Sequence, residues 1–535
     1  MKTSRRARLS ARLLPWLAAA VAFALIGCDN WAPPPTFPPS PTPATEATHA
    51  AAEPTAAVPA AANAQPLFDG WPKPELVLVL TGQQLGYIEP CGCTGLENQK
   101  GGLARRHTLI KELSDRGWPV VPLDVGSQVR RYGKQSELKF QHSADALRIM
   151  GYRAIALGAD DLRLPAGELL SGTNPPDQPS LFVGANLALI DRDLQPQFLV
   201  IEAGGKRIGV TSVLGKKYES RLQSDELVHG PATLALQTVA AQLTAAKCDL
   251  HVLLAHAPQE EVREIAKELP LFDLIVVAGQ TNVPSSELEV LPGGKTRLMQ
   301  TGIKAMYAGV VGVFDEPPEG NALRGEPKFR FESVPLDARL KDSPEMLKLL
   351  AKNQEQLQDL GLEGLGLTPR PHTSGRQFVG SDKCGECHTK AFEIWSQTPH
   401  AHATDSLVKP PNTRGDIARH FDPECLSCHV TGWDPQQFHP FESGYLGLEP
   451  TPLLKHNGCE NCHGPGSAHV AAEEGGAKIA PVDIAKRRDE MKLPLAGGAA
   501  ERKCLECHDD DNSPDFHHQG AFQKYWKAVE HAGKE

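Results

Sequence analysis

Between residues 75 and 335, short apolar runs alternate with longer segments whose apolar residues recur at helical spacing. Runs of this kind are typical of buried strands, whereas spacings of three and four residues indicate amphipathic helices. The expected helices include residues 104–113 and 233–246. This alternation predicts an α/β domain built in layers. The expected strands are residues 76–80, 120–123, 154–157, 208–213, 251–255 and 274–277.

The pattern changes on both sides of this domain. Residues 30–74 are mostly Pro, Ala and Thr, a composition that cannot bury a core and predicts a disordered tether. Five leucines near helical spacing in residues 343–365 predict a helix that leads into the C-terminal part. From residue 376 onward, frequent Gly and Pro predict short helices and loops. The predicted segments are 1–27 (signal), 28–74 (tether), 75–335 (α/β domain), 336–375 (helical linker) and 376–535 (C-terminal domain).

The first 28 residues resemble a bacterial lipoprotein signal. A basic start is followed by an apolar stretch from about Leu13 to Leu25 and by Ile26, Gly27 and Cys28. Acylation of Cys28 would anchor the chain to a membrane. The alternative is an ordinary secretory signal in which Cys28 is incidental. We therefore expect the chain on the periplasmic side of a bacterial membrane, with the choice between inner and outer membrane open.

Charge and composition narrow the classes of partner. The net charge is −10, and the residues before Cys28 carry five cations and no acid, so a chain beginning there would carry −15. This balance argues against nucleic acid as a partner. No apolar run reaches the roughly 18–20 residues of a membrane-spanning helix, which excludes a multi-pass membrane protein.

The pattern Cys-x-x-Cys-His occurs four times in the C-terminal part, far beyond coincidence. Two thiols at this spacing can add to the two vinyl groups of one haem, and the adjacent His then becomes the proximal ligand of its iron. We expect four covalently attached c-type haems. Two zinc ribbons would also use Cys-x-x-Cys pairs, but a His after every pair argues against them. The four motifs are Cys384, Cys387 and His388; Cys425, Cys428 and His429; Cys459, Cys462 and His463; and Cys504, Cys507 and His508.

The sixth iron ligands should be mostly histidines. From Gln377 onward the chain has one Met but nine His outside the motifs. An iron with two His ligands is saturated and passes electrons, whereas an iron with an open position can bind a substrate. The residue types alone leave both possibilities open. The nine candidates are His400, His402, His420, His439, His456, His469, His517, His518 and His531.

Several stretches around these motifs resemble the tetrahaem cytochrome c-554 family over roughly residues 376–535. They include Phe378–Ser381, Trp395–Ala403 and Cys459–His469. The resemblance implies electron transfer and points to His400 and His469 as distal ligands of haems bound by other motifs. His402 is a close rival to His400. Some relatives keep one haem five-coordinate, so the resemblance leaves an open site undecided.

Residues 75–335 resemble the N-terminal domain of periplasmic 5′-nucleotidases of the calcineurin-like metallophosphatase superfamily. Gly101–Arg106, Met150–Ile155 and Phe272–Ile275 carry the resemblance, which implies an αββα sandwich. The dinuclear metal site of that family needs several carboxylates and imidazoles to activate water. Here only one histidine remains, so we expect no phosphoesterase activity. The positions that correspond to the family's ligands hold Gln83, Leu85, Ser127, Ala159, Asp160, Gln280, Asn282 and His256.

Two smaller features lie beside these positions. Asp124, Asp160, Asp161 and His256 could form a rebuilt mononuclear metal site, but solvated carboxylates and a hydrogen-bonded His explain them more simply. The Cys91-Gly-Cys93 sequence could be a reducible disulfide, a soft-metal site or a static pair.

Together these patterns predict a membrane-tethered tetrahaem cytochrome that relays electrons between redox partner proteins, fused to an α/β domain without phosphatase chemistry. One alternative is a multihaem oxidoreductase that acts on a small nitrogen or sulfur compound at an open haem. Another is a metal-dependent phosphoesterase with an accessory cytochrome, against which the missing ligands argue.

Overall fold

The computed structural model describes residues 66–91, 98–222, 224–315, 328–410, 416–475, 478 and 480–531. All of them belong to one compact unit, Pro59–Glu535. The expected signal, the lipidation site Cys28 and most of the tether lie outside the described residues. No helix among the described residues is long and apolar enough to cross a membrane.

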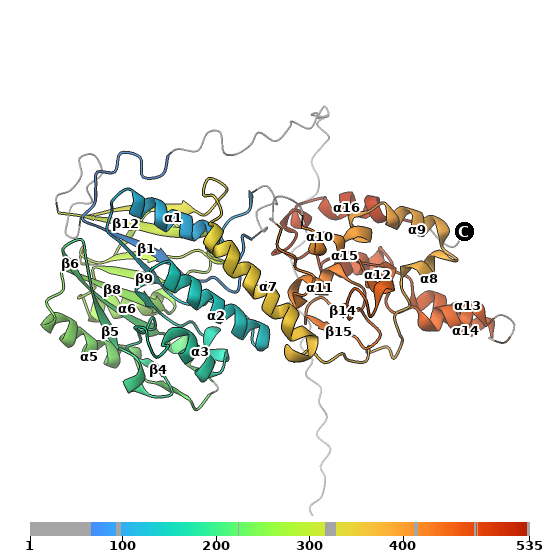
Figure 1. Ribbon diagram of the computed structural model, residues 1–535, viewed down its shortest axis with the longest axis horizontal. Helices are drawn as coiled ribbons and strands as arrows, with labels where there is room; N and C mark the ends of the chain where they lie inside the picture. Colours follow the sequence, from blue (N-terminus) through green and yellow to red (C-terminus); the bar gives the residue numbers. More distant parts are fainter. Residues whose placement is uncertain are drawn as a thin grey trace, which may run out of the picture. The chain divides into compact units, whose positions relative to one another are not determined.

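Two large sheets form the centre of the N-terminal part (Figure 1). The first has the strand order β13-β12-β1-β2-β3, and the second has the order β10-β11-β9-β8-β6-β5. Strands β1, β2 and β3 run parallel, as do β6, β8, β9 and β11. The strands are β1 (Leu76–Thr81), β2 (Val120–Asp124), β3 (Ala154–Ile155), β4 (Leu187–Leu189), β5 (Phe198–Ala203), β6 (Lys206–Leu214), β7 (Leu227–His229), β8 (Leu250–His256), β9 (Leu274–Val277), β10 (Glu289–Val290), β11 (Arg297–Gln300), β12 (Tyr307–Phe314) and β13 (Lys328–Pro335).

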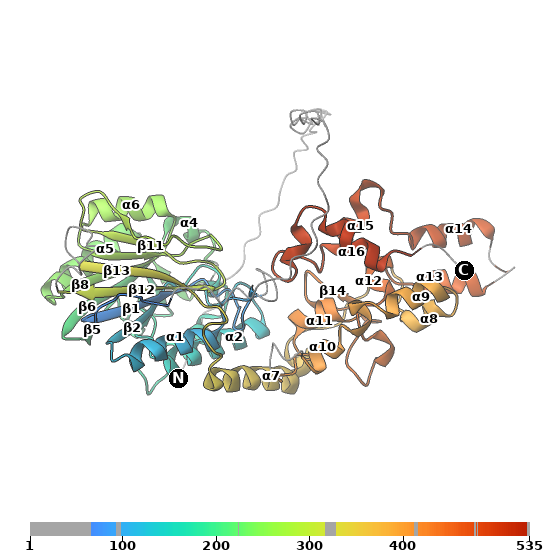
Figure 2. The ribbon, with the colours of Figure 1, turned by 90° about the horizontal axis from the view of Figure 1, so that it is seen from above.

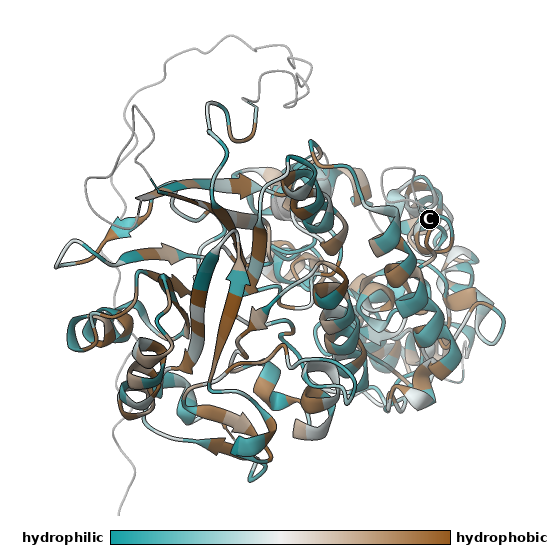
Figure 3. Ribbon diagram, turned by 60° about the vertical axis from the view of Figure 1, so that its left-hand side comes forward, coloured by the Kyte–Doolittle hydropathy of each residue, from teal (hydrophilic) through white to brown (hydrophobic). Residues whose placement is uncertain are grey.

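The alternation of side chains along β1 shows how the layers are held together. Leu76, Leu78 and Leu80 point into a core between the two sheets, whereas Val77 and Val79 belong to a second core beneath the helices. Successive strand residues face opposite sides of a sheet, so a central strand with helices on one side and a sheet on the other is apolar throughout. Figure 3 shows the resulting hydrophobic stretches along the strands.

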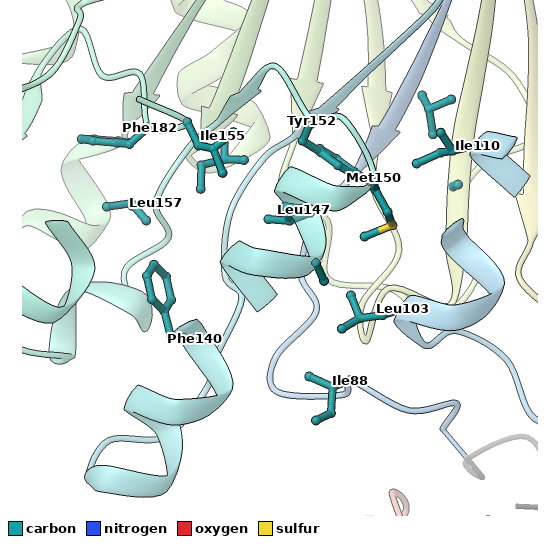
Figure 4. Packing of buried hydrophobic residues seen from close by; sticks show 14 of the residues in the cluster. Ile88, Leu103, Ile110, Phe140, Leu147, Met150, Tyr152, Ile155, Leu157 and Phe182 are labelled. Atoms are coloured by element: carbon teal, nitrogen blue, oxygen red, sulfur yellow. The ribbon is translucent and has the colours of Figure 1, made fainter. Parts of the chain in front are cut away.

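Helices cover the outer face of each sheet (Figure 2). Phe140 and Leu147 of α2 pack with Ile155 and Leu157 under the first sheet (Figure 4), and Leu236 of α5 and Val262 of α6 pack on the second. The domain is therefore an αββα sandwich, as predicted. Its helices are α1 (Leu103–Asp115), α2 (Lys134–Ile149), α3 (Ala166–Thr173), α4 (Lys216–Glu219), α5 (Ala232–Ala245) and α6 (Gln259–Glu268).

The expected helices and strands of this domain are observed, with one difference. Strand β3 covers only Ala154–Ile155, two residues less than predicted. Beyond Ala156 the chain leaves the sheet, and the backbone amide of Ala159 donates a hydrogen bond to Nε2 of His256, at 3.3 Å. The two further apolar residues are still buried, Ala156 in the core between the sheets and Leu157 in the core beneath the helices.

The helix expected after the sandwich is α7 (Pro344–Gly364). Its buried residues Met346 and Leu350 pack on the sandwich core, and Leu357 joins a small cluster with Leu138 of α2 and Leu365. Gly361 has a φ of 56°, which kinks the end of the helix.

The C-terminal region consists of short helices and loops, as predicted, with a small apolar core. Among the described residues of this region, the main apolar cluster has six buried members, among them Trp433 and Tyr445. So few buried apolar groups can offset little of the conformational entropy lost on folding. The region contains β14 (Trp433–Asp434), β15 (His439–Pro440), α8 (Ser381–Gly385), α9 (Thr389–Ser396), α10 (Asp405–Val408), α11 (Pro423–His429), α12 (Cys459–His463), α13 (Ser467–Glu474), α14 (Pro481–Glu490), α15 (Ala499–Cys504) and α16 (Ala521–Val529).

Candidate functional site

All four Cys-x-x-Cys-His motifs lie on or beside short helical turns. The backbone amide of His388 bonds to the carbonyl oxygen of Cys384, at 2.9 Å, and His508 bonds to Cys504 in the same way. One helical turn thus places the histidine beside the first cysteine. The second and third motifs form the ends of α11 and α12 themselves.

A single cavity of about 1240 Å³ brings three of the motifs together. This volume exceeds the range of about 300–1,000 Å³ for sites that hold one small ligand, so the cavity has room for more than one. The motif residues on its wall are Cys384, Cys387, His388, Cys459, Cys462, His463, Cys504, Cys507 and His508, and the further histidines are His372, His400, His439, His469 and His531.

Across this cavity, a second imidazole faces the histidine of each of these three motifs. The ring centroids are 6.2 Å apart for His388 and His469, and 5.9 Å apart for His508 and His400. The third pair, His463 and His531, is 5.8 Å apart. Metal–imidazole bonds are about 2 Å long and the ring centre lies about 1 Å further out, so imidazoles on opposite sides of one ion have centroids about 6 Å apart. The three pairs fit bis-histidine iron coordination.

The geometry separates the two rival histidines of the Trp395–Ala403 segment. His400 faces His508, the histidine of the fourth motif. His402 instead lies 6.3 Å from His456, and neither His402 nor His456 belongs to a motif. The His402 side chain is 65% exposed, and its Nδ1 lies 3.7 Å from Asp405. His531 was not singled out from the sequence, because nothing in its local sequence distinguishes it from the other candidates.

Hydrogen bonds at Nδ1 orient the motif histidines. Nδ1 of His463 donates to the carbonyl oxygen of Met491, at 2.7 Å, and Nδ1 of His429 donates to that of Ala403, at 2.9 Å. Such bonds fix the tautomer, leave Nε2 as the nitrogen with a lone pair and make it a better metal ligand. Burial, followed by the neighbouring His400 ring, lowers the pKa of His508 to about 4.

Cysteines of different motifs lie close to each other. A hydrogen bond between the thiols of Cys384 and Cys459 raises the pKa of Cys384 and lowers that of Cys459 to about 7. An equivalent bond joins Cys428 and Cys507, raising the pKa of Cys507 and lowering that of Cys428. The first motif is therefore adjacent to the third, and the second motif is adjacent to the fourth.

A second polar site lies at the carboxyl ends of β1 and β2, at the positions that correspond to metal ligands in the 5′-nucleotidase-like family and that were expected to hold other residues here. Gln83, Leu85 and Ser127 all have left-handed backbone conformations, with φ between 55° and 62°. Such conformations cost about 1–3 kcal/mol each in residues other than glycine and cluster at functional sites. The backbone keeps this strained shape although the side chains are not metal ligands.

The remaining polar groups of this site bind one another. Asp124 accepts hydrogen bonds from Thr81 (2.6 Å) and Gln128 (2.7 Å), and its carboxylate lies 3.7 Å from the guanidinium of Arg106. Asp161 accepts bonds from three backbone amides at 2.8–3.0 Å, and burial raises its pKa to about 7. Within the described part of the chain, no three His, Cys, Asp or Glu side chains are placed to hold one metal ion. The site therefore does not fit a metal pair.

Asp160 and His256 were also considered for a rebuilt metal site, and each has a different environment. Asp160 lies 3.9 Å from Arg221. His256 is buried, and this burial together with the charge of Arg221 lowers its pKa to about 4, so the ring is neutral at pH 7. Cys91 is disulfide-bonded, whereas Cys93 lies outside the described residues.

Comparisons with known proteins match the two parts of the chain separately. Residues 383–464 match the family described as cytochrome c554 and c-prime. Cytochrome c-554 of Nitrosomonas europaea is 32% identical over 149 residues, which cover 24% of this chain and 57% of that protein. The match therefore spans less than two thirds of the relative.

Other similarities concern the α/β domain. An apyrase of Aedes albopictus is 24% identical over 59% of each chain, and a snake venom 5′-nucleotidase of Gloydius brevicauda is 25% identical over 50% of this chain and 49% of its own. The crystal structure of a 5′-nucleotidase precursor from Thermus thermophilus superposes with a TM-score of 0.44 and 20% identity, covering 53% of this chain and 59% of that one. The chain thus joins a 5′-nucleotidase-like α/β domain to a C-terminal region similar to the cytochrome c554 family.

Proposed function

We propose that this chain is a membrane-anchored periplasmic tetrahaem cytochrome that relays electrons between redox partner proteins, and that its α/β domain has lost metal-dependent hydrolysis. The observation that carries the proposal is the set of three facing imidazole pairs around one large cavity. The similarity of this region to cytochrome c554 supports covalent c-type haem as the bound group.

Each motif would hold one haem through two thioether bonds and one proximal imidazole. When bound, c-type haem supplies reversible one-electron chemistry at its iron. The eight motif cysteines are the attachment points, and His388, His429, His463 and His508 are the proximal ligands. Four motifs make four haems our proposed stoichiometry.

We assign the distal positions from the imidazole pairs. His469 would complete the coordination of the first haem, His531 that of the third and His400 that of the fourth. Two imidazoles occupy both axial positions of an iron and leave no site for a substrate. This coordination favours electron relay over catalysis at these three centres.

The cysteine contacts support an order for the relay. Thiol contacts place the first motif beside the third and the second beside the fourth. Residues of the third and fourth motifs, among them Cys462 and Cys504, line the same cavity, which supports a position of the third motif near the fourth. The proposed order of centres is therefore first, third, fourth and second.

The anchor and the compartment rest on the sequence. The signal-like segment ending at Cys28 supports export and acylation, and the Pro-rich tether would let the folded part extend from the membrane. Redox partners are expected in the same compartment.

Electron paramagnetic resonance of the oxidised, haem-loaded chain tests the assignment of axial ligands. His531→Ala should convert about one haem in four from low spin to high spin and let it bind nitric oxide, since it removes the proposed sixth ligand of the third haem. The matched control is His402→Ala, which removes a histidine that faces no motif and should leave the spectrum unchanged.

The same experiment on the unaltered chain decides between relay and enzyme. Low-spin signals from the first, third and fourth haems are expected. If His402→Ala produced the high-spin signal and His531→Ala did not, the distal assignment would be wrong. A nitric-oxide-binding haem in the unaltered chain would mark an open site and favour an oxidoreductase.

Loss of hydrolase chemistry gives a separate expectation. With Mn²⁺ and a nucleoside monophosphate, the haem-loaded chain should release no phosphate above the level without protein, because the described residues hold no metal cluster. His256→Ala should leave this result unchanged. Mn²⁺-dependent release that disappears in His256→Ala would contradict the proposal.

A further inference from the structure

The edge of the first sheet that carries the altered metal site contacts the fourth haem motif. Tyr87 follows β1, Arg130 follows β2 and Lys304 precedes β12, so all three lie at the same edge of the sheet. Their side chains converge on the carboxylate of Asp511, with Tyr87 Oη at 2.5 Å and Arg130 at 3.1 Å. Lys304 forms a further ion pair with the same carboxylate.

Asp511 is three residues beyond His508, in the loop that orients its imidazole. Nδ1 of His508 lies 2.9 Å from the hydroxyl of Ser513. The carboxylate of Asp509 accepts bonds from the backbone amides of Asp511 and Asn512, which tightens the loop between these groups. Asp511 is therefore close in the chain to the proximal ligand and is held by the other domain.

A second group of contacts holds the helix of the second motif. Glu424, the residue before Cys425, accepts a hydrogen bond from Lys139 at 2.7 Å and pairs with Arg131 at 3.0 Å. Asp422 caps this helix and accepts a bond from Gln135 at 2.6 Å. Acids beside two motifs thus contact one surface, which we call the basic rim: the cations Arg130, Arg131, Lys139 and Lys304, together with the neutral hydroxyl of Tyr87.

The ion pair between Lys304 of the rim and Asp511 is partly buried, so solvent screens it only weakly. The side chain of Lys304 is 7% exposed and that of Asp511 is 20% exposed. Partial burial raises the pKa of Asp511, but bonds from Lys304 and Tyr87 outweigh this and hold it at about 2, so the carboxylate is ionised at neutral pH. Interactions between partly buried charges are stronger than those between exposed ones.

We propose that the basic rim sets the reduction potential of the haem at the fourth motif, by balancing the carboxylate of Asp511 beside its proximal ligand. This inference rests on the proposed function, since it needs a haem at that motif. A net negative charge near an iron centre favours the oxidised form, and a net positive charge favours the reduced form. In this view the α/β domain has exchanged metal binding for electrostatic control of the cytochrome.

Two opposite changes of charge test the proposal. Lys304→Met removes a positive charge and should shift one of the four midpoint potentials to a more negative value. Asp511→Asn removes a negative charge from the same ion pair and should shift the same potential to a more positive value. The double variant should lie close to the unaltered chain. The potentials are measured by spectroelectrochemical titration of the full haem-loaded chain, with the haem content checked first.

The sign of the shift separates charge from mere loosening of the interface. Both variants break the same ion pair, so a purely structural role would move the potential in the same direction in both and would overturn the proposal. Unchanged potentials would also overturn it. Lys295→Met is the control, because Lys295 pairs with Asp273 of the second sheet at 3.1 Å and should shift no potential. A chain without covalent haem would overturn the proposed function and this inference together, whereas four haems with unchanged potentials would overturn this inference alone.

Discussion

Replacing Arg106 with methionine should lower the free energy of unfolding by about 3–5 kcal/mol, the usual cost of removing one partner from a buried ion pair. Arg106 and Asp124 are both fully buried, and their charged groups are 3.7 Å apart. Arg106 also donates to Oε1 of Gln84, at 3.0 Å. Without the guanidinium, the carboxylate of Asp124 would remain in the core with only neutral hydrogen-bond donors.

The cost should depend on pH. Burial raises the pKa of Asp124 above its ordinary value of 3.8, and the charge of Arg106 opposes that rise. In Arg106→Met the folded-state pKa should rise further, so the folded state would bind more protons than the unfolded state above about pH 4. Stability of the variant should therefore fall as pH increases from about 4 toward neutral, relative to the unaltered chain.

Urea denaturation followed by circular dichroism at two pH values measures both effects. Lys111→Met lies on the exposed face of the same helix and should change stability by no more than about 0.5 kcal/mol. Arg106→Met combined with Asp124→Asn should recover part of the loss, since no buried charge then remains without a counter-charge. If Arg106→Met cost no more than Lys111→Met, the pair would not stabilise the fold.

The sandwich could be predicted because each buried strand is a short apolar run that is visible in its own local sequence. Strand β1 is apolar from Leu76 to Leu80, since one face packs on a sheet and the other on helices, and this run is visible without any knowledge of its neighbours. The end of strand β3 could not be predicted from its local sequence. Its end is set by the loop that reaches His256, a residue far away in the chain.

The candidate site likewise has a part that could be predicted from local sequence and a part that depends on tertiary structure. Each Cys-x-x-Cys-His motif is local, so its chemistry could be inferred from spacing alone. The histidine that lies beside each motif histidine is set by tertiary structure, as His531 shows by lying 5.8 Å from His463 although nothing in its own local sequence marks it. The contact between Lys304 and Asp511 could not be predicted either, because each residue is one of many surface charges until the fold brings them together.

The polar groups around Asp124 and the basic rim have a common physical origin. The carboxyl ends of parallel strands meet at one edge of a sheet, where loops with strained backbones can present polar groups. In this chain that edge contains an internally paired carboxylate, Asp124, and a set of cations directed at the cytochrome region. One edge of the first sheet therefore holds both a carboxylate paired within the α/β domain and cations paired with the C-terminal region.

Replacing both Cys459 and Cys462 with serine should remove one of the four proposed haems and separate the first haem from the other two. Cys459 contacts Cys384 of the first motif, and Cys462 lies near Cys504 of the fourth, so the third motif occupies the middle of the proposed relay. Haem content, measured as the pyridine haemochrome per chain, should fall from four to three. Reduction by a protein donor should then show a slow phase of about one third of the amplitude, from the isolated haem.

The matched control is the pair Cys425→Ser and Cys428→Ser, which removes a haem from the end of the proposed order. It should also leave three haems per chain, but these would remain contiguous and should be reduced in one phase. Because the third motif lies against two others, its loss could also destabilise the region, and circular dichroism must first show a folded chain. If that variant does not fold, His463→Met keeps both thioether bonds and should slow transfer through the third centre by changing its axial ligand. A slow phase in the control variant and none in either variant of the third motif would contradict the proposed order, because the third motif would then not lie in the middle of the relay.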